Sequence, residues 1–134
     1  MKMIKGLVSI VLCLCMLCGS CALAANHEFE PFVVAEKEAR YITSASKSDS
    51  EQRWYVTIQS LWITENDKLY FNVRDAKYGT RLSKALSFTT TAPKSTSYTT
   101  TTRQGQNIYL HSQLESSTWT PDSLAYITKG KWCP

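Results

Sequence analysis

The chain has 134 residues, of which 43% are hydrophobic, and this length suffices for one domain with its own core. Its formal net charge is +4, and 15 basic residues are scattered among 11 acidic ones, which argues against a surface for nucleic acid. We therefore expect a single globular domain without nucleic-acid partners.

The start of the chain has the three-part layout of a secretory signal peptide. Two lysines precede an apolar run of about 12 residues from Leu7 to Cys18, which is shorter than the roughly 20 residues of a spanning helix. Ala22-Leu23-Ala24 then fits the A-x-A rule for cleavage between Ala24 and Ala25. We expect a helical signal peptide over 1–24, a mature domain over 25–134 and a secreted product.

A lipid anchor on Cys21 is the alternative outcome of export. Gly19-Ser20-Cys21 resembles the end of a bacterial lipobox, although Cys18 stands where such a motif has an aliphatic residue. The A-x-A site is the better match, so a soluble product without a transmembrane segment is favoured.

Loss of the signal peptide removes four of the five cysteines and leaves Cys133 alone. It also lowers the 15 basic residues to 13, against 11 acidic ones. A single cysteine cannot form an internal disulfide, so core packing must hold the domain together. Because Cys133 is next to the last residue, we expect an accessible, inert thiol in a monomer; the alternative is a dimer linked through Cys133.

The mature domain begins with one segment of helix-forming composition, Ala35–Ile42, and a polar loop over Thr43–Gln52. After these, apolar and polar residues alternate with period two in 54–59, 69–74 and 108–114, which predicts half-buried antiparallel strands. The weaker strand candidates are Phe29–Ala35, Leu82–Thr90, Ser95–Arg103 and Leu124–Thr128, with turns expected at 65–67, 75–80, 92–94, 103–107 and 120–123.

This spacing predicts an all-β domain, an antiparallel β-sandwich of about seven short strands of Ig-like or jelly-roll-like type, with a barrel as the alternative. The Thr/Ser-rich tract Ser87–Thr102 has high β-propensity and is interpreted as an edge hairpin rather than a disordered stalk.

The residues that carry most enzyme chemistry are sparse. His27 and His111 are the two histidines, both interpreted as solvated, and no ligand spacing typical of zinc occurs. No Gly-x-Ser-x-Gly turn and no Gly-rich phosphate loop are present. A Cys133–His111 pair would require a residue near a chain end to be held against a base. We expect no catalytic residue, no metal and no cofactor.

Tyrosines on the predicted strands suggest one binding surface. Tyr55, Tyr70 and Tyr109 project away from the core side, with Arg74 and His111 beside them. Aromatic rings stack on the apolar faces of sugars while polar groups bond their hydroxyls, so this face suits a cell-wall glycan or another envelope component. The alternative interpretation is that these tyrosines only make cross-strand packing contacts.

Trp132 has two interpretations as well. The favoured one is a core residue that closes the sandwich; the other is an anchor at a membrane interface, where tryptophan is enriched.

Three short motifs, Trp54-Tyr55-Val56, Gly79-Thr80-Arg81-Leu82-Ser83 and Gly130-Lys131-Trp132, occur here together with a signal peptide and the intervening Ile108-Tyr109-Leu110 strand. In this the chain resembles a group of small, largely uncharacterised secreted proteins of Gram-positive bacteria, some of which are encoded beside bacteriocin-type export genes. The resemblance implies secretion and a β-rich fold and supplies no catalytic residue. The chain departs from the group in Cys133 and in its Thr-rich central region.

Together these observations favour a secreted, non-enzymatic β-sandwich that binds a component of the cell envelope or the extracellular milieu. The alternative hypothesis is a bacteriocin-like effector that acts on the envelopes of neighbouring cells, with Trp132 and Cys133 taking part.

Overall fold

The computed structural model describes residues 25–35, 39–115 and 123–134. The predicted signal peptide, its cleavage after Ala24 and the alternative lipid site Cys21 therefore lie outside the described residues, as does most of the turn expected at 120–123.

The described ranges form nine strands and no helix. The strands are β1 (His27–Glu28), β2 (Phe32–Ala35), β3 (Ala39–Ser46), β4 (Arg53–Ile63), β5 (Lys68–Arg74), β6 (Leu86–Phe88), β7 (Ala92–Ser97), β8 (Asn107–Glu115) and β9 (Leu124–Cys133). Two strands were not predicted: β1, which precedes the candidate segment Phe29–Ala35, and β3, which begins in the segment of helix-forming composition.

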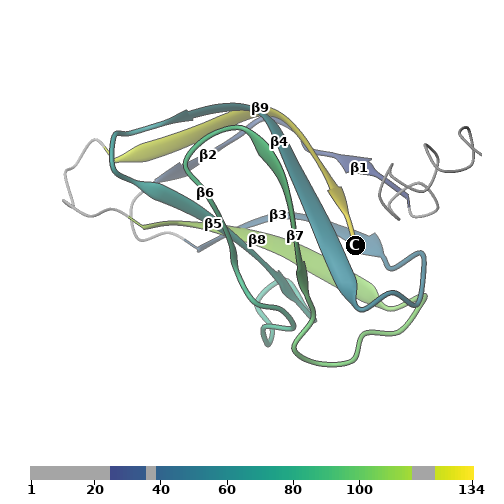
Figure 1. Cartoon of the computed structure of the whole chain (residues 1–134). Coiled ribbons are helices and arrows are strands. Elements are labelled where there is room, and N and C mark those ends of the chain that lie inside the picture. Colours follow the sequence, from purple (N-terminus) through teal and green to yellow (C-terminus); the bar gives the residue numbers. More distant parts are fainter. Residues whose placement is uncertain (1–24, 36–38, 116–122) are drawn as a thin grey trace, which may run out of the picture.

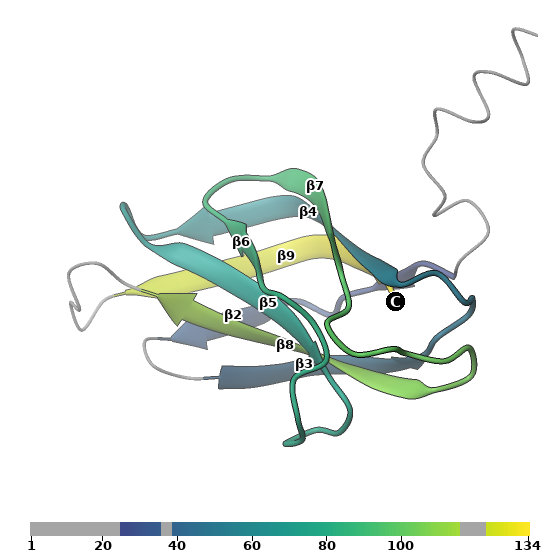
Figure 2. The ribbon, with the colours of Figure 1, turned by 60° about the horizontal axis from the view of Figure 1, so that its bottom comes forward.

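All strand pairs are antiparallel, and they build two sheets that face each other as a sandwich (Figures 1 and 2). The five-stranded sheet has the order β1-β9-β4-β7, with β2 also paired to β9. The four-stranded sheet has the order β3-β8-β5-β6. The prediction of an all-β fold with antiparallel sheets is confirmed.

The core lies between the sheets and is supplied by the alternating strands. Trp54, Val56 and Ile58 of β4 are buried, and so are every second residue of β5 and β8 from Leu69 and Ile108 onward. Alternate side chains of a strand point to opposite faces, so the period-two pattern placed these three strands correctly. The remaining core side chains include Phe29, Phe32, Val34, Phe88, Ile127 and Trp132.

The helix-forming composition of Ala35–Ile42 does not give a helix in the described residues of this segment. Residues 39–42 belong to β3, which continues to Ser46 through part of the expected loop and pairs with β8 along its length. Helix propensity is a weak preference worth less than about 1 kcal/mol per residue. Pairing with β8 and burial of Ala45 against the core outweigh it.

The Thr/Ser-rich tract crosses between the sheets rather than forming the expected hairpin. β6 pairs with β5 in the four-stranded sheet, whereas β7 pairs with β4 in the other. The turn expected at 92–94 is wrong, since these residues open β7. Pro93 is accommodated because β7 is an edge strand, where a missing backbone N–H is tolerated.

The last strand is longer than predicted and buries both Trp132 and Cys133. β9 runs to Cys133 between β1 and β4, with Trp132 opposite His27 and Val56. Trp132 is fully buried, as its interpretation as a core residue requires. The expected accessible thiol is wrong, because Cys133 is held in register with Tyr55 and is only 2% exposed.

Candidate functional site

The outer face of the four-stranded sheet carries a two-dimensional array of polar and aromatic side chains. In one cross-strand row, Ser87, Tyr70 and Gln113 stand side by side on β6, β5 and β8. The next row holds Asn72, His111 and Tyr41, and the third holds Arg74, Tyr109 and Ser44. Because outward residues alternate with core residues on each strand, the same pattern that fills the core also builds this face.

Four of the five predicted site residues share this face: Tyr70, Arg74, Tyr109 and His111. Tyr55 does not, because β4 belongs to the opposite sheet. There the Tyr55 hydroxyl donates to Glu51 Oε1 over 2.7 Å. Periodicity assigned its face correctly relative to the core but carried no information on which sheet holds β4.

His111 is not the solvated residue that was expected, since only 3% of it is exposed. Its ring lies 5.9 Å from the ring of Tyr41, and Asn72 stands across from it on β5. Burial, followed by the positive charge of Arg74, lowers the pKa of His111, while the nearby backbone of Lys77 acts in the opposite direction. The turn after β5 thus covers His111, so this side chain is part of the packing beneath the exposed surface.

Arg74 and Tyr109 are engaged in contacts within the protein. The Arg74 guanidinium donates to Asn72 Oδ1 over 3.3 Å and to the carbonyl of Gly79 over 3.2 Å. Tyr109 accepts a hydrogen bond from Asn107 Nδ2, and its ring lies 6.0 Å from that of Tyr41. These residues therefore shape the face more than they offer it to a ligand.

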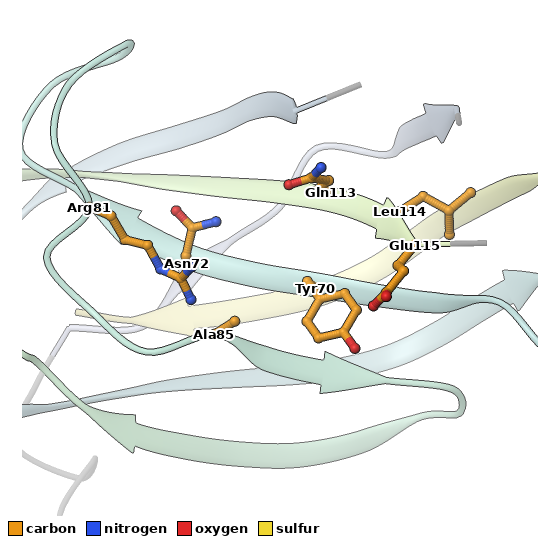
Figure 3. A pocket seen from close by; sticks show the side chains of 7 residues that line it. All are labelled: Tyr70, Asn72, Arg81, Ala85, Gln113, Leu114 and Glu115. Carbon is orange, nitrogen blue, oxygen red and sulfur yellow. The ribbon is translucent and has the colours of Figure 1, made fainter. Parts of the chain in front are cut away.

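A groove of about 440 Å³ opens beside Tyr70 on this face (Figure 3). Its walls come from β5, β8 and the segment between β5 and β6, and its lining residues are Tyr70, Asn72, Arg81, Ala85, Gln113, Leu114 and Glu115. Figure 3 shows Arg81 near Asn72 at one end and Glu115 next to Tyr70 at the other. The groove thus combines one aromatic ring, two amides and two opposite charges.

Glu115 fixes the Tyr70 ring. A side-chain hydrogen bond to Glu115, followed by burial and the carboxylate charge, raises the pKa of Tyr70 above its ordinary value. Tyr70 therefore stays a neutral phenol at physiological pH, with one edge bound to the carboxylate. Arg81 is positioned similarly, since its Nε donates to the carbonyl of Ser83 over 2.7 Å.

Reasoning from the sequence did not assign five of the groove-lining residues to the site: Arg81, Ala85, Gln113, Leu114 and Glu115. Arg81 and Ala85 lie between β5 and β6, because the predicted strand Leu82–Thr90 is shortened to Leu86–Phe88, and outside a strand no periodic pattern indicates a direction. Glu115 is the last residue of β8 and lies opposite Lys68. Its outward position follows from the alternation of Tyr109, His111 and Gln113, so a longer strand prediction would have found it.

A second hollow of about 300 Å³ lies on the other side of His111, between Tyr41 and the turn after β5. Lys77 Nζ stands 5.1 Å from the centre of the Tyr41 ring and 5.5 Å from that of Tyr78. Exposed aromatic and polar groups therefore continue along the sheet beyond the groove.

Within residues 25–35, 39–115 and 123–134, no three His, Cys, Asp or Glu side chains gather closely enough to hold a metal ion. Over the same residues, no helix has the length and hydropathy needed to cross a bilayer. No protein-family model, curated protein or solved structure matches the chain.

Proposed function

We propose that the protein is a secreted, non-enzymatic binding protein, and that the Tyr70 groove binds a glycan of the cell envelope. The observation that supports this most is the composition of the groove: one ring with hydrogen-bonding groups on both sides. The C–H groups of a sugar pack on an aromatic ring, and amides bond its hydroxyls in either direction, as donor and as acceptor.

The ends of the groove favour a sugar that carries charged or amide substituents. Arg81 presents a planar guanidinium that matches a carboxylate in two parallel hydrogen bonds. Glu115 accepts hydrogen bonds from hydroxyl or amide N–H groups. The groove is open rather than enclosed, which suits one unit of a long polymer better than a small molecule that must be surrounded.

An effector role in which Trp132 and Cys133 contact a target envelope has less support. Both residues are buried in β9, so neither is available to a membrane or a partner in this fold.

The test measures binding of the purified protein to isolated peptidoglycan by co-sedimentation. Tyr70→Ala removes the ring, and a lost aromatic contact of about 0.5–1.5 kcal/mol predicts a roughly two- to tenfold weaker affinity. Gln113→Ala removes one hydrogen-bonding amide and should weaken binding by a similar factor.

Tyr55→Ala is the matched control. Tyr55 is also a half-buried strand tyrosine bonded to a glutamate, but it lies on the opposite sheet. It should bind like the unchanged protein. Equal affinities for the Tyr70→Ala, Gln113→Ala and unchanged proteins would contradict the proposal.

A further inference from the structure

The outer face of the five-stranded sheet carries a row of exposed hydrophobic side chains. Val33 of β2 stands opposite Tyr126 of β9, and Tyr126 stands opposite Trp62 of β4. Their exposed fractions are 38%, 42% and 58%. Exposed apolar residues are ordinary when scattered singly. Here three of them are aligned across three adjacent strands, which Figure 1 shows side by side in one layer.

We propose that the Val33–Tyr126–Trp62 row is a second glycan-binding site, so that the protein bridges two glycan strands through its opposite faces. The bridging rests on the proposed function of the Tyr70 groove, whereas the row itself rests on its own geometry.

The shape of the row suits a sugar. Adjacent strands lie about 4.8 Å apart, so the row extends roughly 10 Å across the sheet. Side chains directly opposite each other on neighbouring strands are close enough to touch. Trp62 and Tyr126 therefore present an indole and a phenol at facing positions of neighbouring strands, onto which consecutive sugar rings of a strand can stack.

The size of the row argues against a stable protein partner. Two aromatic side chains of about 150–250 Å² each, roughly half exposed, together with one valine expose on the order of 300 Å². A stable protein interface buries about 800 Å² on each partner. The strip is too small for a second copy of the chain, whereas it is large enough for a sugar ring.

The surroundings of the row are polar, as a sugar requires. Thr128 is the next outward residue of β9, and its hydroxyl is 2.5 Å from that of Ser60 on β4. Lys129 follows, exposed and without an ion-pair partner among the described side chains. The hydroxyls and the ammonium group beside the two rings can hydrogen-bond the hydroxyls of a glycan. Binding to a lipid surface does not require such hydrogen bonds.

The position of the two sites gives the functional consequence. The groove opens from the outer side of the β3-β8-β5-β6 sheet and the row from the outer side of the other sheet, so they face away from each other. One glycan segment cannot occupy both. Two sites that engage different strands convert weak single contacts into avidity and link the strands.

The experiment compares clumping with binding on isolated peptidoglycan sacculi, by turbidity and by co-sedimentation. The unchanged protein should clump sacculi. Trp62→Ala/Tyr126→Ala should still co-sediment but lose clumping by at least about fivefold. Tyr70→Ala/Gln113→Ala should also lose clumping while retaining weaker binding through the row, and only the quadruple variant should lose both. Tyr55→Ala serves as the control for substitution of a tyrosine on the same outer face as the row.

The outcomes separate the two proposals. Clumping by Trp62→Ala/Tyr126→Ala equal to that of the unchanged protein overturns the second site and leaves the groove proposal standing. If Trp62→Ala/Tyr126→Ala no longer co-sediments at all, while Tyr70→Ala/Gln113→Ala co-sediments like the unchanged protein, the groove does not bind the glycan. This result overturns the proposed function of the groove and with it the bridging. A change from dimer to monomer in light scattering, or loss of binding to anionic lipid vesicles, would instead assign the row to self-association or to membranes and overturn the inference.

Discussion

At the scale of single residues, Gly130 shows how closely the backbone of β9 is approached by its neighbours. A Cβ atom at this position would stand 2.8 Å from Phe29 Cδ2 and 2.9 Å from the carbonyl oxygen of Thr57. Phe29 is in turn stacked against Phe71, with ring centres 6.0 Å apart. The glycine of the Gly130-Lys131-Trp132 motif is therefore required by packing, since even a methyl group displaces a core ring and a backbone oxygen.

Gly130→Ala should destabilise the domain by about 1–3 kcal/mol, the usual cost of inserting a group into a packed core. Urea unfolding followed by tryptophan fluorescence measures the change. Phe29→Leu removes part of the ring that the new methyl group meets, so Gly130→Ala should cost less in that background. Equal costs in both backgrounds would show that Phe29 is not the obstacle.

At the scale of elements, β9 is the strand on which the five-stranded sheet depends. It pairs with β1 and β2 along one side and with β4 along the other. Trp132 anchors its end in the core, opposite Val56 and 6.2 Å from the ring of His27. Loss of this ring leaves a cavity at the point where three strands meet.

Trp132→Ala should therefore cost about 3–5 kcal/mol, as other buried large-to-small substitutions do. This is a large part of the roughly 5–15 kcal/mol that stabilises a typical domain. Urea midpoints measure it. Lys131→Ala, on the adjacent half-exposed position of the same strand, should change stability by no more than about 0.5 kcal/mol. A cost at Trp132 as small as that at Lys131 would contradict its role as an anchor.

The same scale shows which elements can be predicted from the sequence. β4, β5 and β8 were found because each has one buried and one outward face, and burial leaves a period-two pattern in the chain. In β3 only Ala45 is buried, so its residues show no period-two pattern and the strand was not predicted. Strand pairing, which put β3 beside β8, is a property of the assembled sheet and not of the segment.

At the scale of the whole molecule, the candidate site was predictable in part, because the period-two pattern also shows which side chains of a strand point outward. Alternation placed Tyr70, Tyr109 and His111 on outward positions, and the structure brings them onto one face. It could not assign Tyr55 to the other sheet, because periodicity gives the face of a strand and not its sheet. The burial of His111 was missed because it is covered by Tyr41 and the turn after β5, which are distant from it in the sequence.

His111 makes the stability of the whole domain depend on pH. Its folded-state pKa is lowered from the ordinary 6.5 by burial and by the charge of Arg74. Below pH 6.5 the unfolded chain therefore binds a proton at His111 that the folded chain binds only at a lower pH. The stability should be greatest above pH 6.5 and should fall as the pH drops through 6.5 toward the folded pKa, by at most about 1.4 kcal/mol per pH unit.

The measurement is the urea midpoint between pH 8 and pH 5.5, above the range where carboxylates titrate. His111→Gln removes the proton-binding group and should flatten the curve over this window. His27→Gln, at the chain's other histidine, serves as the control for the substitution itself. If His111→Gln keeps the full slope, the buried imidazole is not its source, and the contacts of Asn72, Tyr41 and Arg74 around it would have to hold it equally well in both charge states.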